Sequence, residues 1–323
     1  MYTHRDIMFR TIFIINCIVE RNLKVQNGEL LLEEESKERK RTLTKIPFQK
    51  VLALFVVGNI TITTPLIEKC QKYGVALIVM KTNLRPVFYW SNFAEANYLL
   101  RQKQYRQKDN VSIAKMIVIN KIKNQRKLLE KTRKKDNVVT FAKTQCNMAL
   151  DKLITDVDYD KLLGIENNVA KYFFEAYYQD YQWNTRRPRT KCDILNTTLD
   201  LGYTILFNFT ECFVRMFGFD LYVGVYHRLW FKRKSLICDL MEPFRCIVDH
   251  TILLAFNKKQ FSANDFECIN GMYYLKFEKK KDYYHIFYDA MIEKKSDFFK
   301  YVQSYYRCFM KGSPITSYPE FTI

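Results

Sequence analysis

The sequence has little glycine, no long apolar run and no signal-peptide pattern. Only 9 of its 323 residues are Gly, and none of them builds the Gly-rich loop that cradles nucleotide phosphates. No stretch reaches the roughly 18 uncharged apolar residues that would cross a bilayer, and Met1 to Arg10 carries Asp6 and no cleavage pattern. These absences predict a soluble protein of the cytoplasm.

Cysteine occurs without a pairing pattern. The 9 Cys are an odd number, and no two of them form a Cys-x-x-Cys pair. This pattern argues against a disulfide framework and against a cysteine zinc site. We therefore expect the cysteines to be reduced residues of the core.

Acidic residues are too few to balance the basic ones. The chain has 34 Asp and Glu but 52 Lys and Arg, which gives a formal net charge of +18 and an isoelectric point near 9.4. Such a surplus indicates a polyanionic partner, either nucleic acid or an anionic membrane. At 48% hydrophobic residues the chain is globular, and its length suggests two domains.

The first part of the chain has the pattern of a β layer. Apolar or β-branched runs predict strands within 9–18, 22–34, 51–57 and 75–81. Asn27-Gly28 predicts a hairpin turn, Thr64-Pro65 the start of a helix and Gly74 its end, while 33–41 predicts an exposed loop or strand edge. The strand pattern stops within 82–92, and helical spacing follows. We therefore expect an α+β fold, with a β-rich domain over 1–88 and a mainly α-helical domain over 89–323.

The helical part begins with a strongly basic segment. Residues 101–144 contain fourteen Lys or Arg against Asp109, Glu130 and Asp136, which is +11 of the total charge. A basic helix is usually a solvated face. Here there are too few acidic residues to form i,i+4 pairs, so contacts to phosphates are the better interpretation, with an affinity that falls with salt.

One acidic residue lies on an apolar helix face. The spacing of Leu162, Val169 and Phe173 within 155–182 predicts a buried face, and Glu166 falls in its middle. A carboxylate in that place must be paired or bind a ligand, because isolated buried charge is costly.

The segment from His227 to Asp249 combines one imidazole with three carboxylates. If Ser235 caps a helix that runs through Asp249, spacings of three and seven residues place Asp239, Glu242 and Asp249 near one another. Buried carboxylates beside a histidine suit a divalent metal. The segment also allows an ordinary histidine, a helix-capping Glu242 and two solvent-facing Asp, and the pattern alone leaves both interpretations open.

Three separated segments resemble the motifs of one family, the CRISPR-associated protein 1 family of spacer-acquisition integrases. They are 163–171, 193–203 and 218–249, in matching order and spacing. The resemblance implies a β-sandwich-like N-terminal domain that dimerises and an α-helical catalytic domain. It also implies a site for Mg²⁺ or Mn²⁺, with Glu166, His227 and Glu242 as ligands and Asp239 as a supporting carboxylate.

The sequence departs from the family pattern without losing a ligand. Asn167 stands where the family usually has Gly, and Phe173 where it often has Tyr, so we expect no tyrosine hydroxyl at that position. Leu221 and Cys246 each replace a common Pro. The aromatic-rich helical part hints at a type V system.

The function that the resemblance implies is insertion of short foreign DNA fragments into a CRISPR array, by attack of a 3′-hydroxyl on a phosphodiester at the repeat boundary. The expected partners are double-stranded DNA, a second copy of the chain and CRISPR-associated protein 2, with no membrane. Two rivals remain: a hydrolytic DNA endonuclease with the same site, and a non-catalytic basic DNA-binding protein. The predicted phosphate contacts are the basic residues near the ligands in sequence: Arg186, Arg187, Lys191, Arg228, Lys232, Arg233, Lys234 and Arg245.

Overall fold

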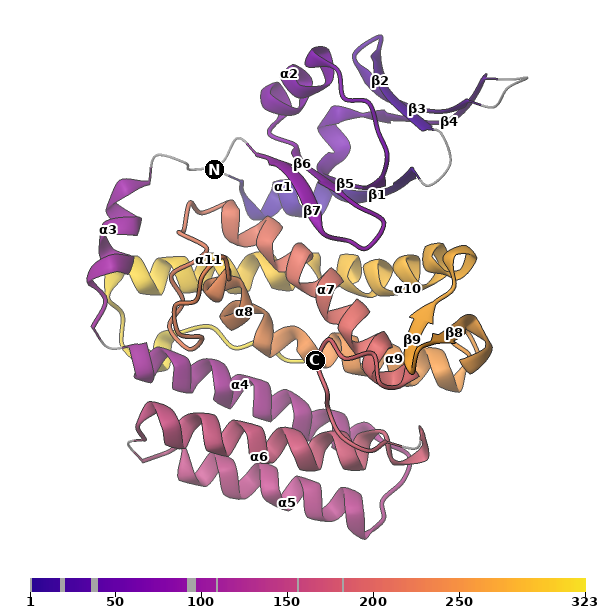
Figure 1. Ribbon diagram of the computed structural model, residues 1–323. Coiled ribbons are helices and arrows are strands. Elements are labelled where there is room, and N and C mark those ends of the chain that lie inside the picture. The colour runs from indigo at the N-terminus through magenta and orange to yellow at the C-terminus, as the bar shows by residue number, and fades with distance from the viewer. Residues whose placement is uncertain are drawn as a thin grey trace. The chain divides into compact units, whose positions relative to one another are not determined.

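The computed structural model describes residues 2–17, 21–35, 40–91, 97–108, 110–155, 157–181 and 183–323. They form two compact units (Figure 1). The β-rich unit comprises Met1–Arg101, Glu211–Phe219 and Ile292–Lys300, and the helical unit comprises Gln102–Thr210, Asp220–Met291 and Tyr301–Ile323. The predicted class, a β-rich N-terminal part followed by a mainly helical part, is confirmed. The domain boundary predicted after residue 88 stays a prediction.

The β-rich unit contains two sheets. A four-stranded sheet has the order β1-β5-β6-β7, in which β7 alone is antiparallel to its neighbour, and a three-stranded antiparallel sheet has the order β2-β3-β4. The elements are α1 His4–Phe9, β1 Thr11–Cys17, β2 Arg21–Gln26, β3 Glu29–Glu35, β4 Lys40–Pro47, β5 Val51–Gly58, α2 Thr64–Tyr73, β6 Ala76–Met80 and β7 Pro86–Trp90.

The two sheets share one apolar core. Leu23, Leu30 and Ile46 of the three-stranded sheet belong to the same buried cluster as Leu54 and Leu77 of the four-stranded sheet. Strand β5 is buried along almost its whole length, because it is a central parallel strand covered on both faces. This arrangement confirms the sandwich-like packing.

Local sequence signals explain most turns of this unit. Asn27 and Gly28 both have positive φ, as the tight turn between β2 and β3 requires, and Gly74 ends α2 in the left-handed conformation. The strand pattern ends within 82–92, as expected, but β7 at 86–90 was not predicted as a strand. It is an edge strand with Val87 and Phe88 exposed, so it lacks the buried run that marks β5 and β6. Within 33–41, strands occupy 29–35 and 40–47, and the remaining positions lie outside the described residues.

The helical unit and its junctions contain most of the helices. Their bounds are α3 Tyr98–Arg106, α4 Asn110–Lys131, α5 Asn137–Lys152, α6 Tyr159–Tyr177, α7 Ile194–Arg215, α8 Ser235–Met241, α9 Arg245–Asn257, α10 Lys280–Glu293 and α11 Lys295–Lys311. A short hairpin joins β8 Phe266–Ile269 to β9 Met272–Leu275. Short 3₁₀ helices occupy Phe48–Lys50, Gln179–Tyr181, Glu242–Phe244, Ala263–Asp265, Phe277–Lys279 and Ile315–Ser317. None of the helices in the described part of the chain is both long and apolar enough to cross a bilayer.

Helices α4, α5 and α6 lie side by side (Figure 1). Asp136 caps α5 by accepting from the backbone N–H of Val139 at 3.0 Å, and Asp158 caps α6 by accepting from that of Lys161 at 2.8 Å. The buried face of α6 carries Glu166, as the spacing predicted. Helix α4 also packs against the segment from α8 to α9, so it stands between the two carboxylate-bearing regions.

The continuous helix expected from Ser235 to Asp249 is not present. Lys234 is the N-cap of α8, and Ser235 is its first residue. The helix gives way at Glu242 to the 3₁₀ turn Glu242–Phe244, because Pro243 has no N–H to continue the α-helical ladder, and α9 begins at Arg245. Among the described residues these three carboxylates do not form a group that could hold one metal ion, and Asp249 bonds to Tyr203.

Asp249 is buried against two tyrosines. The hydroxyl of Tyr203 donates to its Oδ1 at 2.6 Å, and that of Tyr178 to its backbone carbonyl at 3.2 Å. Burial raises the pKa of the Asp249 carboxyl to about 7, although Tyr203 and Arg245 oppose the rise. The interpretation that Asp249 faces solvent was therefore wrong.

We expect Asp249→Asn to gain stability over the wild type as pH rises. The wild-type carboxyl ionises near pH 3.9 in the unfolded chain and near pH 7 in the folded one, so its contribution to stability falls between these values. The free energy of unfolding of the variant, relative to the wild type, should rise by about 2–3 kcal/mol between pH 5 and pH 8. Urea unfolding at both pH values measures this, and an unchanged difference would contradict the assignment.

Candidate metal centre

A buried lysine holds two of the predicted metal ligands together. The ammonium of Lys121, on α4, forms an ion pair with Oε1 of Glu166 on α6 and lies 2.7 Å from Oε2 of Glu242 at the end of α8. All three side chains are at most about a tenth exposed. Glu166 and Glu242 are thus brought to the same cation, although 76 residues separate them in sequence.

Lys121 is buried because of its place on α4. Ile117, Val118 and Ile122 are buried on the same helix, three or four positions away or adjacent. Burial lowers the pKa of the ammonium, but Glu166 and then Glu242 outweigh burial and raise it above its ordinary value. Lys121 is therefore a permanent positive charge inside the helical unit.

Glu242 is ionised by its neighbours. Burial opposes ionisation, but Arg245, Lys121 and His227 outweigh it in that order and hold the pKa of the carboxyl to about 2. Nε of Arg245 lies 2.8 Å from Oε2 of Glu242. The contact is a close ion pair between two buried atoms. Oε2 of Glu242 is therefore a buried anionic atom that lies against two cations, Lys121 and Arg245.

His227 is oriented by Asp239. Its Nδ1 lies 2.7 Å from Oδ1 of the carboxylate, and the backbone N–H groups of Val225, Tyr226 and His227 donate to the same carboxylate at 2.6, 3.1 and 2.8 Å. An ionised carboxylate can only accept, so Nδ1 of His227 carries a proton and Nε2 is the nitrogen that does not contact Asp239. A Cβ at Gly224 would lie 2.5 Å from Oδ2 of Asp239, so only glycine permits this close approach.

The donor set fits a divalent cation. Two carboxylates and one imidazole nitrogen suit Mg²⁺ or Mn²⁺, and a histidine whose other nitrogen bonds a carboxylate is the usual arrangement of a metal ligand. In this chain Asp239 occupies that place beside His227. As the side chains stand, no three His, Cys, Asp or Glu among the described residues are close enough to hold one ion. Lys121 lies between the two carboxylates in that arrangement, so a metal would compete with its ammonium.

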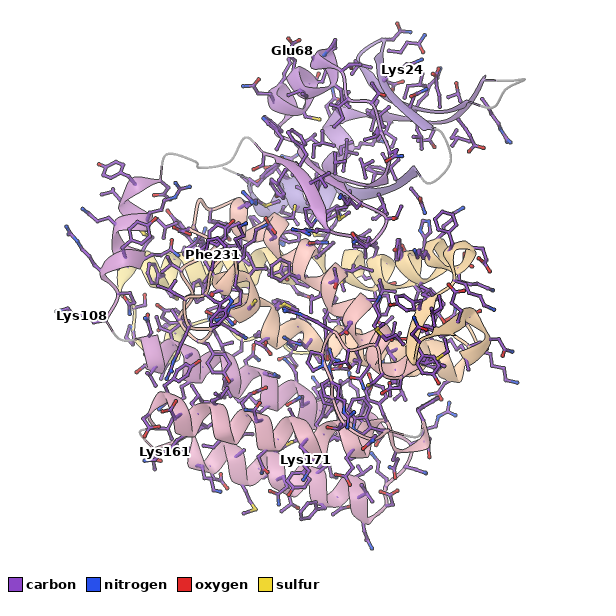
Figure 2. All side chains as sticks on the ribbon, viewed as in Figure 1. Lys24, Glu68, Lys108, Lys161, Lys171 and Phe231 are labelled. Atoms are coloured by element: carbon purple, nitrogen blue, oxygen red, sulfur yellow. The ribbon has the colours of Figure 1, made fainter. Side chains whose placement is uncertain are left out.

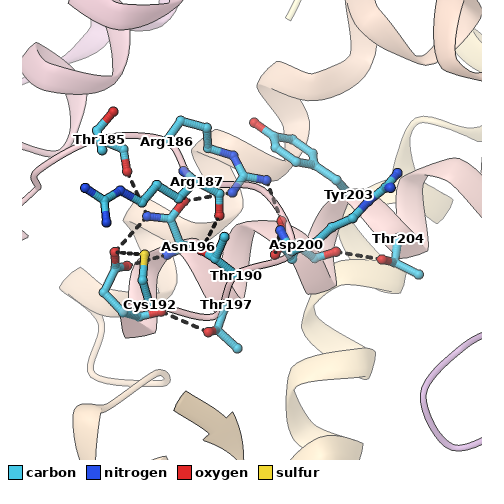
Figure 3. A network of polar contacts seen from close by, with 12 residues as sticks. Thr185, Arg186, Arg187, Thr190, Cys192, Asn196, Thr197, Asp200, Tyr203 and Thr204 are labelled. Carbon is cyan, nitrogen blue, oxygen red and sulfur yellow. Dashed lines mark hydrogen bonds and ion pairs between the residues drawn. The ribbon is translucent and has the colours of Figure 1, made fainter. Parts of the chain in front are cut away.

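Three of the predicted phosphate contacts lie in the loop before α7. The guanidinium of Arg186 donates to Oδ1 of Asn196 at 2.8 Å and to Oδ1 of Asp200 at 2.5 Å, as Figure 3 shows. Arg186 therefore holds the loop onto α7. The side chain of Arg187 is exposed, and the ammonium of Lys191 lies 3.8 Å from the ring centre of Tyr274.

The remaining predicted contacts lie around His227. Arg228 is exposed, pairs with Asp160 at 3.1 Å and lies over the ring of Tyr159, while Lys232 is exposed. The guanidinium of Arg233 donates to the backbone carbonyl of Arg228. Lys234, at the N-cap of α8, is half-buried, and Arg245 faces Glu242. The role of all eight residues in binding DNA stays a prediction.

Sequence reasoning missed two residues of this centre. Lys121 was counted only as part of a basic segment, although its spacing from buried Ile117 and Val118 marks it as inward-facing. Tyr226 was not singled out, yet its buried hydroxyl has no hydrogen-bond partner among the described residues. Burial, and after it Glu166 and Glu242, raises the pKa of this hydroxyl, which therefore lies in the field of both carboxylates.

Comparisons with known proteins agree with one family. The model of the family described as CRISPR associated protein Cas1 matches residues 18–289. A CRISPR-associated endonuclease Cas1 of Thermodesulfovibrio yellowstonii is 26% identical over 286 residues, which cover 84% of this chain and 90% of that protein.

Solved structures share the fold. A chain of a Cas6-RT-Cas1–Cas2 complex has a TM-score of 0.77 at 19% identity, and the match covers 97% of this chain but 36% of that one. A casposase bound to its integration product has a TM-score of 0.75 at 18% identity, over 96% of this chain and 94% of that one. With a family match over most of its length and this fold, the chain belongs to the Cas1 family of CRISPR-associated proteins.

Proposed function

We propose that this protein is a metal-dependent DNA integrase of CRISPR adaptation, which joins the 3′-hydroxyl of a short DNA fragment to a phosphodiester at the edge of a repeat. The observation that carries the proposal is the pair of buried carboxylates, Glu166 and Glu242, held around one cation beside a histidine that Asp239 orients. Well-packed apolar residues would stabilise the fold at least as well as these buried charges, so stability alone does not explain the charges. The casposase relative in fold, which was solved with its integration product, supports strand transfer.

Glu166, Glu242 and His227 would hold the Mg²⁺ or Mn²⁺ ion. When bound, that ion would supply Lewis-acid stabilisation of the charge that develops in phosphoryl transfer. The chain prepares the ligands for it. Arg245 and Lys121 keep Glu242 ionised, and Asp239 fixes the ring of His227 with Nε2 free to ligate.

The basic residues of the helical unit would bind the DNA backbone. Arg187, Arg228 and Lys232 have exposed side chains near the centre in sequence, and the lysines of α4 and α5 extend the charge. These contacts would make affinity fall with salt without reading sequence. A hydrolytic endonuclease would use the same site with water as the nucleophile. This activity is our second candidate, because the Thermodesulfovibrio relative is named an endonuclease.

We also propose assembly with other chains. The relative in fold that was solved as a Cas6-RT-Cas1–Cas2 complex supports a partnership with CRISPR-associated protein 2. The β-rich domain, 1–88, would form the homodimer, and the domain from 89 to 323 would hold the catalytic centre.

Replacing Glu166 with Gln should abolish strand joining and keep DNA binding. The substitution removes one anionic ligand at nearly constant volume, so we expect joining to fall by about 100-fold or more. The assay measures transfer of a labelled short duplex with free 3′-hydroxyls into a supercoiled plasmid that carries a CRISPR leader and repeat, with Mn²⁺, Mg²⁺ or EDTA.

Glu175→Gln is the matched control, because Glu175 is exposed on the same helix. Joining that survives in Glu166→Gln would contradict the catalytic role. Products that are only shortened would identify a nuclease, and DNA binding without any product would identify a non-catalytic binder.

Replacing Lys121 with Met should destabilise the protein without metal and strengthen metal binding. Loss of the ammonium leaves Glu166 and Glu242 buried without their shared cation, which costs about 3–5 kcal/mol. A divalent ion no longer competes with Lys121, so Mn²⁺ should raise the melting temperature more in the variant than in the wild type. Thermal unfolding and calorimetric titration with Mn²⁺ measure both effects.

Lys123→Met is the control, since Lys123 lies on the same helix as Lys121 and forms an exposed ion pair with Glu320. An exposed pair contributes about 0–1 kcal/mol, so this variant should behave as the wild type. Equal stabilisation of Lys121→Met and the wild type by Mn²⁺ would show that the ion binds elsewhere.

A further inference from the structure

Two buried asparagines lie on α4, next to Lys121 or one turn from it. Asn120 and Asn124 are 1% and 2% exposed, whereas lysines of the neighbouring helix α6, such as Lys161 and Lys171, are exposed (Figure 2). A buried amide must have hydrogen-bond partners, because leaving its donors unpaired costs more than an apolar residue would. The partners of each asparagine therefore show what it holds in place.

Both asparagines bind the backbone of residues 321–323. The side chain of Asn120 accepts from the N–H of Phe321 at 2.9 Å and donates to its carbonyl at 2.7 Å. The side chain of Asn124 accepts from the N–H of Ile323 at 3.1 Å and donates to the carbonyl of Phe321 at 2.9 Å. A backbone N–H can only donate and a carbonyl can only accept, so these bonds fix the orientation of both amide groups.

Asn124 makes one further bond, to the turn that carries Glu242. Its Nδ2 also donates to the carbonyl of Pro243 at 3.1 Å, so both hydrogens of the amide are used. Pro243 directly follows Glu242 in the 3₁₀ turn between α8 and α9. Among the described residues, the side chain of Asn120 bonds only Phe321. The two asparagines therefore differ in their contact with this turn.

The turn needs support from outside, because Pro243 has no N–H with which to continue the helical ladder. One side of the turn is held by packing, since the buried ring of Phe244 has its centre 4.5 Å from that of Phe321. Apolar packing has no fixed direction, whereas the hydrogen bond from Asn124 fixes the peptide group between Pro243 and Phe244. That peptide group lies one residue beyond Glu242, so the bond restricts the direction in which the Glu242 side chain leaves the backbone.

The bond to Pro243 does not depend on the charges around the carboxylate. Lys121 lies three residues before Asn124 on α4, and its ammonium is 2.7 Å from Oε2 of Glu242. A metal would compete with that ammonium for the carboxylate. Asn124 contacts the backbone instead, so its bond remains when the partner of the carboxylate changes. A ligand that is held in this way does not have to be ordered again when it binds.

We propose that Asn124 is a positioning residue of the metal centre, which directs Glu242 toward the ion through the carbonyl of Pro243. This role deepens the proposed function and rests on it for the metal that Glu242 would hold. Asn120 shares the helix, the burial and the contacts to Phe321, but it has no such role.

The first test measures the affinity of the full chain for Mn²⁺ by calorimetric titration without DNA. Asn124→Ala removes the bond to Pro243, so we expect the Kd for Mn²⁺ to rise by about 10- to 100-fold, as when a group that orients a metal ligand is lost. Asn120→Ala is the matched control, because it removes two buried bonds to Phe321 and leaves Pro243 untouched. Its Kd should stay close to that of the wild type.

Hydrogen exchange of the metal-free protein gives a second readout that does not need the ion. The backbone N–H of Arg245 donates to the carbonyl of Glu242 and closes the turn. Both alanine variants should speed exchange in peptides that cover 321–323. Only Asn124→Ala should also speed exchange in peptides that cover 242–247, because only this variant releases the turn.

Asn124→Asp and Asn120→Asp repeat the comparison with side chains of the same size, in case an alanine variant does not fold. Aspartate keeps the oxygen that accepts from the backbone N–H and loses the amide donors. Both substitutions add one negative charge to the same helix, so the contrast between the two positions still reports on the bond to Pro243. Melting temperatures and circular dichroism establish which variants fold.

Three outcomes would overturn the proposal: an unchanged Kd for Mn²⁺ in Asn124→Ala, an unchanged exchange at 242–247, or equal effects of the substitutions at the two asparagines. The last would assign Asn124 to anchoring residues 321–323 alone. A wild type that binds Mn²⁺ but joins no DNA would reject strand transfer and leave this role standing. A wild type that binds no Mn²⁺ would reject the metal centre itself, and with it the role of Asn124 toward the ion.

Discussion

The burial of Lys121 between Glu166 and Glu242 is the constraint on which the helical unit depends. Two carboxylates inside a protein repel one another and lose their hydration, so a cation must accompany them. Lys121 meets this need from α4, and Arg245 adds a second positive charge beside Glu242. Helices α4 and α6 and the end of α8 must therefore keep their mutual positions. A group of well-packed apolar residues would hold these helices at least as firmly, so the charges indicate function.

His227 is held by a different and independent device. Asp239 accepts three backbone N–H groups as well as the imidazole, so its carboxylate both shapes the loop and fixes the ring. Gly224 is the residue that lets the backbone come this close. The side chain of His227 is 27% exposed, whereas those of Glu166 and Glu242 are nearly closed off. The centre is thus closed on its carboxylate side and open to solvent at the histidine.

The sequence predicted those features that depend on neighbours along the chain. The turn at Asn27-Gly28 and the end of α2 at Gly74 follow from backbone preference alone, and the burial of Glu166 follows from helical spacing. The prediction of one helix from Ser235 to Asp249 was wrong, because a proline can either begin a helix or interrupt one. Only the packing of the folded chain decides which of the two occurs at Pro243.

Features that depend on distant pairing could not be predicted. Lys121 reads as a surface lysine until the carboxylates that it meets, 45 and 121 positions away, are known. Strand β7 was missed for a related reason, since its apolar and aromatic run does not by itself distinguish a short strand from a helical segment, and the pairing with β6 decides. The proposed metal ligands were chosen from motif resemblance, whereas Lys121, which pairs with Glu166 and Glu242, was found only in the fold.

The basic residues near the centre divide by what their side chains bind. Arg186, Arg233 and Arg245 are engaged by an amide, a carboxylate or a backbone carbonyl of the protein itself. The planar guanidinium suits such fixed acceptors, whereas the ammonium of an exposed lysine is strongly hydrated and keeps its freedom. Net charge therefore overstates the number of basic groups that are free to contact the proposed DNA partner. Loss of one of these arginines would first loosen a loop or the α8 terminus, and any loss of DNA binding would follow from that displacement.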